Sequence, residues 1–373
     1  MKKTRLNKSN TFLLLLLLAT LGAGLPVLAA CDDTKYRTQI VTYKELDEQV
    51  QGYGDTRCRY YTGPRGGLRC KIRLRGTLYY PLASAYDHPV GQPAPDFPAI
   101  LINHGSEQTF EADNKFCDHA EYFVPKGYIV FVPFRRGHGD DDQGERNMST
   151  GVYIEDLLDD FVNGTNNYVH NTNCTNRSCY KAELLKEQAD EEIAQAMDWL
   201  ERRNDVKTDP GEPRDYRIAI MGISYGGAVT VFANRHDLGQ KAAVAFSPGA
   251  QQWDPSVNCI PGDPNCGTDF QRSLISAAGG ADKPAYYLQA KWDYDTRASI
   301  DLAYAHAYGS NDPQHSRGWN AAIFPYVNPC IDANDDPRPC TSADYQSIHA
   351  GFFKDVGKWG PTVSDFLKRN KVT

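Results

Sequence analysis

The sequence lacks several features that mark other classes of protein. Beyond residue 30 it has no apolar run of about 20 residues, the length that crosses a bilayer as a helix. It has no internal repeat, no glycine-rich phosphate loop of the P-loop or Rossmann kind, and no His or Cys pair at the HExxH or CxxC spacing of metal sites. We therefore expect no metal and no cofactor.

Positive charge is also in deficit. The 373 residues include 40 Lys and Arg against 47 Asp and Glu, a formal net charge of −7. This balance gives no electrostatic reason to expect a nucleic-acid partner. With 41% hydrophobic and 23% charged residues, the composition is that of a globular protein with enough apolar side chains for a large core.

Residues 1–30 have the features of an export signal. Four Lys and Arg residues within the first eight positions precede an unbroken apolar run, Phe12–Leu18, and small residues follow before a cleavage site. A transmembrane anchor is the alternative, but two glycines and a proline interrupt the run before it reaches the length of a bilayer span. We expect the mature protein to be exported.

The residues around Cys31 leave two modes of export open. The sequence Leu28–Cys31 resembles a bacterial lipobox, in which the cysteine is lipidated and attaches the protein to a membrane. Cleavage after Ala29 by an ordinary signal peptidase fits equally well. The protein is accordingly expected to be periplasmic, secreted or a membrane-anchored lipoprotein, always in an oxidising compartment.

Ten cysteines are consistent with this location. Close spacing suggests local disulfides, although connectivity does not follow from sequence. The remaining pair, Cys31 and Cys117, either forms a fifth bridge or consists of an acylated Cys31 and a free Cys117. The local pairs are Cys58–Cys70, Cys174–Cys179, Cys259–Cys266 and Cys330–Cys340.

After a polar N-terminal arm over residues 31–66, residues 67–373 read as one catalytic domain. Alternating apolar residues over 72–80 predict a strand, and the spacing of apolar residues over 180–203 predicts a helix. Strands that alternate with helices predict an α/β fold with a mainly parallel sheet covered on both faces. Short apolar runs predict buried strands at 99–103, 128–133, 218–221, 242–246, 285–289 and 321–324.

Three polar segments, 135–179, 248–272 and 326–348, interrupt this alternation. Each follows a predicted strand, so each should emerge at the carboxyl edge of the sheet, where α/β proteins build their sites. Each also contains one of the proposed short disulfides. We favour a cap of disulfide-stapled loops over the active site; tolerated surface insertions are the alternative.

Ser224 is the predicted nucleophile. It lies in Gly222–Gly227, between the strand that ends at Met221 and a helical pattern, which is the context of a nucleophile elbow. Gly222 and Gly226 lack side chains and so let strand and helix approach, and the Tyr225 N–H lies beside the exposed hydroxyl. A serine hydroxyl is a weak nucleophile at neutral pH, so an adjacent base is required.

His349 is the predicted base, because hydrolases with this elbow have the chain order Ser, acid, His. Of the downstream histidines it alone follows the last predicted strand. It precedes a terminal helix, and we expect it in a loop. His236 is too near Ser224 in sequence to reach it, His306 sits in a helical stretch, and His315 precedes the last strand.

Asp293 is the predicted acid, since it comes soon after the strand that ends at Gln289. Asp295 is the alternative, with helix capping as its structural role. The second oxyanion donor is expected from Ser106, after the strand that ends at Asn103, paired with Tyr225. His104 is expected to be structural.

These motifs carry a family resemblance. Gly222–Gly227, Gln289–Asp295 and His349–Phe352 resemble the dienelactone hydrolase and prolyl-oligopeptidase-like branch of the α/β-hydrolases, over about residues 70–370. The resemblance implies the α/β-hydrolase fold. Two departures stand out: Trp292 occupies a position where relatives often have Asn, and the nucleophile is Ser where dienelactone hydrolase has Cys.

The sequence thus predicts an exported serine hydrolase that acts through an acyl-enzyme on a small-molecule ester. An exported peptidase acting on short peptides is the first alternative. The second is a non-catalytic hydrolase-fold lipoprotein that serves as a binding or scaffold protein. For Arg136 and His138, a structural role is favoured over substrate contact. The sequence sets neither the substrate nor the oligomeric state.

Overall fold

The fold was taken from a computed structural model of the chain. It describes residues 34–49, 59–62, 66–82, 96–106, 109–110, 112–140, 149, 174–209, 212–249, 252–254, 267–281, 283–293, 297–308, 321–325, 330, 338 and 340–373. The predicted signal, Cys31, and most of the three segments expected to form a cap lie outside these residues.

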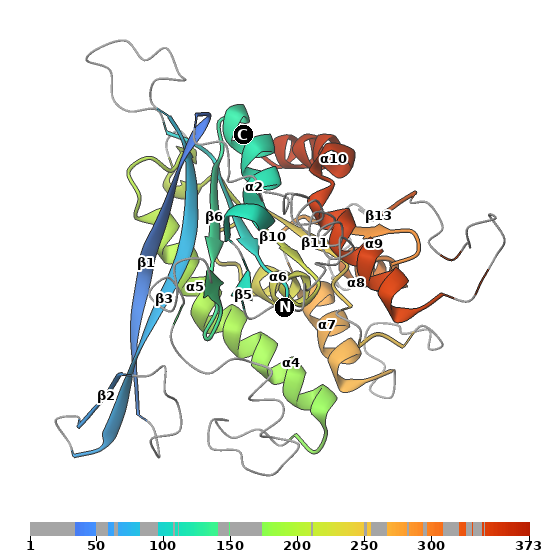
Figure 1. The fold of residues 1–373 in the computed structure, drawn as a ribbon, viewed down its shortest axis with the longest axis horizontal. Coiled ribbons are helices and arrows are strands. Elements are labelled where there is room, and N and C mark those ends of the chain that lie inside the picture. The colour runs from blue at the N-terminus through green and yellow to red at the C-terminus, as the bar shows by residue number, and fades with distance from the viewer. Residues whose placement is uncertain are drawn as a thin grey trace, which may run out of the picture.

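A mainly parallel sheet forms the centre of the molecule (Figure 1). Its strand order is β1-β3-β6-β4-β10-β11-β12-β13, with β2 paired to β3. Strand β3 pairs antiparallel with β1, with β2 and with β6. All neighbouring pairs from β6 to β13 in this order are parallel. The strands of this sheet are β1 Tyr36–Gln49, β2 Arg59–Thr62, β3 Leu68–Pro81, β4 Ala99–Asn103, β6 Ile129–Pro133, β10 Ile218–Ile223, β11 Ala242–Phe246, β12 Ala285–Ala290 and β13 Ala321–Phe324. Two short pairs lie outside it: β5 Thr109–Phe110 with β7 Gly139–Asp140, and β8 Thr208–Asp209 with β9 Glu212–Tyr216.

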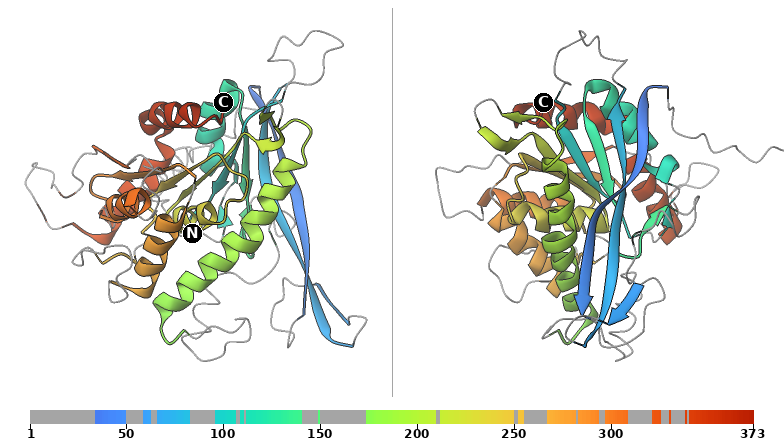
Figure 2. Two further views of the ribbon diagram at one scale, coloured as in Figure 1. Left: turned by 180° about the vertical axis from the view of Figure 1, so that it is seen from behind. Right: turned by 90° about the vertical axis from the view of Figure 1, so that its left-hand side faces the viewer.

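Helices cover both faces of the sheet, as Figure 2 shows. Alternate residues of one strand face opposite layers: Leu101 of β4 belongs to the buried cluster that includes residues of α4 to α8, and Ile102 belongs to the cluster that includes residues of α2, α9 and α10. Burial on both faces explains why the central strands read as continuous apolar runs. The helices are α2 Ala112–Phe123, η2 Val124–Lys126, α4 Arg177–Glu187, the π-helical η4 Gln188–Ile193, α5 Ala194–Glu201, α6 Tyr225–Arg235, α7 Asp269–Gly280, α8 Arg297–Tyr308, α9 Ser342–Lys354 and α10 Val356–Arg369.

The predicted mainly parallel sheet with flanking helices is confirmed, and the structure adds two strands to it, β1 and β2, both from the expected N-terminal arm. Residues 36–49 of the expected N-terminal arm form β1, which pairs with β3 along 13 positions from Tyr36–Pro81 to Gln49–Arg69. Polar side chains alternate with Tyr36 and other inward residues, so this outer strand shows a weaker apolar pattern than the central ones. The arm is therefore part of the sheet.

The direction in which the chain adds strands to the sheet reverses between β4 and β10. From β4 the chain continues to β6 on one side, and from β10 it continues to β11 on the other, while β4 and β10 are themselves neighbours. The carboxyl ends of β4 and β10 thus form a topological switch point, where open α/β sheets bind ligands. Ser106 and Ser224 follow these two strands.

Two predicted disulfides are confirmed. Cys174 and Cys179 are bonded with Cα atoms 5.4 Å apart, and Cys330 and Cys340 with Cα atoms 4.8 Å apart. Cys117 in α2 is also disulfide-bonded, so the alternative in which it is a free thiol is wrong. The other two expected bridges rest on side chains outside the described ones. Among the described residues, no helix combines the length and apolarity needed to span a membrane.

Candidate active site

Ser224 sits in a sharp turn between β10 and α6. The strand ends at Ile223 and the helix begins at Tyr225. Ser224 has φ 55° and ψ −119°, a left-handed conformation that L-residues rarely adopt and that costs about 1–3 kcal/mol. Its N–H donates to Phe246 O of the neighbouring strand at 2.9 Å. The turn therefore has the strand–turn–helix form that the glycine motif predicts.

The two motif glycines allow backbones to touch. A Cβ at Gly222 would lie 2.2 Å from Gly226 O. A Cβ at Gly226 would lie 2.2 Å from both Asn103 O and His104 O. At either position an added Cβ would overlap a neighbouring backbone atom, so the start of α6 packs directly on the end of β4.

Asp293 and His349 form a buried pair. His349 Nδ1 lies 2.8 Å from Asp293 Oδ1, with the two side chains 9% and 0% exposed. Because a carboxylate accepts hydrogen bonds, Nδ1 carries the proton in this pair and Nε2 is the ring nitrogen available for chemistry. Asp293 lies in the turn after β12, where its N–H donates to Ala290 O at 3.2 Å. The alternative acid, Asp295, lies outside the described residues.

His349 lies on helix α9, which corrects the expectation of a loop. The helix starts with a capping box, in which the Thr341 side chain and the Asp344 side chain each bond to the other's backbone N–H. Arg338 holds Asp344 through two contacts of 2.7 and 2.6 Å. The Cys330–Cys340 bridge immediately precedes this cap. The segment 326–348 is therefore in part helical.

Aromatic packing fixes the orientation of α9. Phe352 and Phe353 follow His349 by three and four positions, so the three side chains share one face of the helix. Phe353 packs on His119 of α2 and on Phe246 of β11, with ring centroids 4.2 and 5.3 Å apart. Trp359 Nε1 donates to Phe352 O at 3.0 Å. These contacts hold His349 toward the carboxyl edge of the sheet.

Ser224, Asp293 and His349 therefore occur in this chain order, after β10, β12 and β13, with the serine in a strained turn and the acid paired with the histidine. The chain has the α/β-hydrolase fold. The fold implied by the motifs is thus confirmed by the order of its strands and by the geometry of the serine turn.

Comparison with known proteins finds solved structures that are similar to this chain at low sequence identity. No protein-family model and no curated protein matches the sequence. Among solved structures, an inferred dienelactone hydrolase from Klebsiella pneumoniae is 12% identical over 86% of this chain and 99% of its own, with a TM-score of 0.37. The acylaminoacyl peptidase of Pyrococcus horikoshii is 14% identical over 87% of this chain and 40% of its own, with a TM-score of 0.45. An esterase of Pyrococcus furiosus is 14% identical over 84% and 89%, with a TM-score of 0.42.

The two expected oxyanion donors lie on adjacent backbone segments. Ser106 follows β4, and Tyr225 is the first residue of α6, whose N–H has no acceptor within the helix. Asn103 Nδ2 donates to Thr230 Oγ1 at 2.9 Å, which in turn donates to Gly226 O at 2.9 Å. The end of β4 is thereby tied to the first turn of α6.

Arg135 supports the loop that carries Ser106. Its fully buried guanidinium donates to His104 O at 2.8 Å and to Gly105 O at 2.5 Å. The same group lies 5.0 Å from the ring centroid of Tyr225. Arg135 thus contacts the backbone of the His104–Gly105 segment and the side-chain ring of Tyr225. His104 is buried within this network, where it contacts Arg135 through both ring nitrogens, and the geometry gives it a structural place.

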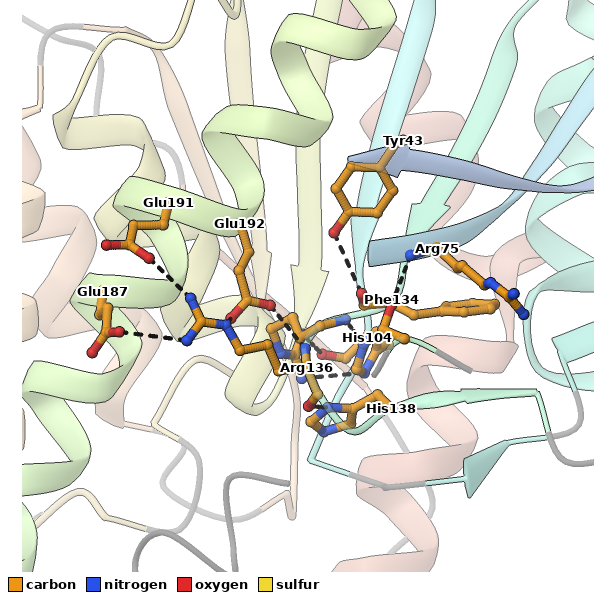
Figure 3. A network of polar contacts seen from close by, with 11 residues as sticks. Tyr43, Arg75, His104, Phe134, Arg136, His138, Glu187, Glu191 and Glu192 are labelled. Carbon is orange, nitrogen blue, oxygen red and sulfur yellow. Dashed lines mark hydrogen bonds and ion pairs between the residues drawn. The ribbon is translucent and has the colours of Figure 1, made fainter. Parts of the chain in front are cut away.

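Arg136 faces three glutamates (Figure 3). Its Nε lies 3.1 Å from Glu192 Oε1 and its backbone N–H donates to Glu192 Oε2 at 2.9 Å. Burial raises the pKa of Glu192 to about 7, although Arg136 opposes this shift. His138 Nδ1 lies 2.8 Å from Arg136 O. Arg136 and His138 thus belong to one network of polar contacts.

The rejected histidines lie away from the predicted triad. His306 is buried on α8, with Nδ1 3.2 Å from Ala278 O. His236 Nε2 pairs with Asp190 at 2.6 Å beyond the end of α6. His315 lies outside the described residues. Within the part of the chain that the structure describes, no group of three His, Cys, Asp or Glu side chains could hold a metal ion.

The sequence analysis missed two residues at this edge. Arg135 comes two residues after the buried strand β6, and a charged residue so close to a buried strand must be paired, which is the signal for it. Ser247 belongs to no motif. Its signal was its position, because it is a polar residue immediately after β11, between the strands that lead to Ser224 and Asp293.

Proposed function

We propose that the protein is an exported serine hydrolase that cleaves carboxylic esters through an acyl-enzyme. The observation that carries the proposal is the buried Asp293–His349 pair, 2.8 Å apart, at the same sheet edge as a serine held at φ 55°. Strained residues and buried ion pairs concentrate at functional sites. Here the strained serine is followed along the chain by the aspartate and then the histidine of the buried pair.

In the proposed reaction His349 Nε2 takes the proton of the Ser224 hydroxyl while the Ser224 oxygen attacks the ester carbonyl carbon. The tetrahedral intermediate collapses when the imidazolium returns this proton to the leaving alkoxide. Water then attacks the acyl-enzyme with His349 again as base, which releases the acid and restores Ser224. Asp293 keeps Nδ1 protonated and stabilises the imidazolium in both halves.

The negative charge that develops on the carbonyl oxygen needs donors in place beforehand. The N–H groups of Ser106 and Tyr225 are the proposed donors, and one such donor contributes about 100- to 1000-fold to kcat. Arg135 supports this assignment because it contacts the His104–Gly105 backbone and the Tyr225 ring together. A loop fixed from beneath does not have to reorganise during the reaction.

The exported location is part of the proposal. The cationic and apolar pattern of residues 1–30 and the two disulfides, Cys174–Cys179 and Cys330–Cys340, support it. Membrane attachment through a lipidated Cys31 is the form of export that the lipobox-like sequence suggests. No cofactor enters any step of the proposed chemistry.

A panel of chromogenic substrates tests the proposal. The mature protein is assayed on p-nitrophenyl acetate and butyrate and on short peptide p-nitroanilides, beside Ser224→Ala and His349→Ala. Hydrolysis of the esters that disappears in both variants is expected. His236→Ala is the matched control, since it removes a histidine that forms an ion pair with Asp190 at the C-terminal end of α6, whereas Ser224 precedes the other end. Peptide hydrolysis without ester hydrolysis, or residual activity in Ser224→Ala comparable with the wild type, would contradict the proposal.

A further inference from the structure

Ser247 lies at the same edge of the sheet as Ser224 and Asp293 of the predicted triad. It directly follows β11, the strand between those that lead to Ser224 and Asp293. It is 2% exposed, and its N–H donates to Leu288 O of β12 at 2.9 Å. Its hydroxyl donates to Asp293 Oδ2. The Asp293 carboxylate is thus held from two sides, by Ser247 at Oδ2 and by His349 at Oδ1.

The backbone at Ser247 is strained. Its φ is 47°, in the left-handed region that favours glycine. Ser224 and Trp292 have φ of 55° and 73°, so successive strands β10, β11 and β12 each lead into a non-glycine residue with positive φ. A glycine would relieve this strain at position 247 at no steric cost. Strain of this kind persists where the surroundings impose it and is concentrated at sites with a function.

We propose that Ser247 is a positioning residue that fixes the orientation of the triad acid, an inference that rests on the proposed hydrolase function. A carboxylate can rotate about its Cβ–Cγ bond, and only one rotation directs Oδ1 at His349 Nδ1. The Ser247 hydroxyl fixes this rotation by occupying Oδ2. It also compensates the second oxygen of a side chain that is 0% exposed and would otherwise lose its hydration. The side chain, rather than the turn, is what the chemistry requires at position 247.

Two substitutions separate the hydroxyl from the turn. Ser247→Ala removes the hydroxyl and keeps the strain, whereas Ser247→Gly removes both. If the hydroxyl positions Asp293, both variants lose activity to the same extent, and the glycine variant has the higher melting temperature of the two. Asp237→Gly is the matched control. It relieves a φ of 44° just beyond the far end of α6, where its side chain makes an exposed ion pair with Lys283.

We expect both Ser247 variants to turn over substrate more slowly, while every molecule keeps a functional active site. A hydrogen bond to a charged group corresponds to a loss of about 10- to 100-fold, which should appear in kcat for p-nitrophenyl acetate with KM changed less than about twofold. The fluorophosphonate labelling rate should fall by the same factor, while every molecule still takes one label. Asp237→Gly should keep the wild-type kcat and labelling rate.

Two results would overturn the proposed role of Ser247. A third would overturn the proposed hydrolase function as well. Ser247 variants that label and turn over at the wild-type rate would show that the hydroxyl has no effect on the triad. A reduced fraction of labelled molecules at the wild-type rate per active site would show a purely structural role. A wild-type protein that takes no label and cleaves no ester would overturn the proposed function, and the role of Ser247 with it.

Discussion

Gly226→Ala tests how the fold builds the site, because position 226 is where α6 meets the end of β4. The new Cβ would lie 2.2 Å from the carbonyl oxygens of Asn103 and His104, whereas ordinary contacts begin near 3.4 Å. One backbone must therefore move by about 1.2 Å, and overpacking of this kind typically costs about 1–3 kcal/mol of folding stability. The β4 loop carries Ser106 two residues beyond His104, so the Ser106 N–H, the proposed oxyanion donor, should move as well.

We expect Gly226→Ala to lower the free energy of unfolding by about 1–3 kcal/mol and kcat by about 100- to 1000-fold, the effect of losing one oxyanion donor. Urea unfolding and turnover of p-nitrophenyl acetate measure the two quantities on the same preparation. Gly357→Ala is the matched control, since a Cβ on this α10 residue meets nothing within 4 Å. It should keep full activity. Wild-type stability and kcat in Gly226→Ala would refute the reasoning that places the loop against α6.

Three further predictions concern buried charges. Asp293→Asn should lower kcat about 1000- to 10,000-fold at unchanged KM, because an amide can stabilise the wrong histidine tautomer. Steady-state kinetics measure this, and a decrease in kcat of less than about tenfold would contradict the prediction. Arg135→Met should lower kcat more than it raises KM, since the His104–Gly105 carbonyls lose their donor; an unchanged kcat would argue against support of the oxyanion loop. Glu192 has a folded-state pKa of about 7, above its ordinary value, so its protonation stabilises the fold at low pH and this contribution is lost as pH rises from about 4.5 to about 7. Urea unfolding across this range should show a smaller decline of stability in Glu192→Gln than in the wild type, and equal declines would contradict the assignment.

The central strands and the order of the site residues could be predicted because their signals are local. Strands buried on both faces read as apolar runs, and β4, β10 and β12 appear at the predicted places. The serine motif carries its own glycines, and each packs against backbone as the motif requires. The chain order of such hydrolases then leads to Asp293 and His349.

Other features could not be predicted because they depend on distant partners. Strand β1 has a weak apolar pattern and exists because it pairs with β3. His349 lies within α9, whose start is capped by Thr341 and Asp344, although a loop is expected there from the sequence. Arg135 and Ser247 act on backbone and side chains brought near by the sheet, and no local pattern records such contacts.

The labelling of Ser224 tests the central claim most directly. Purified mature protein is treated with a fluorophosphonate, beside Ser224→Ala, and both are measured by intact mass. We predict one adduct on the wild type and none on the variant, because only a serine activated by the Asp293–His349 pair reacts at neutral pH. A folded wild-type protein that takes no adduct, or a Ser224→Ala variant that takes one, would contradict the account.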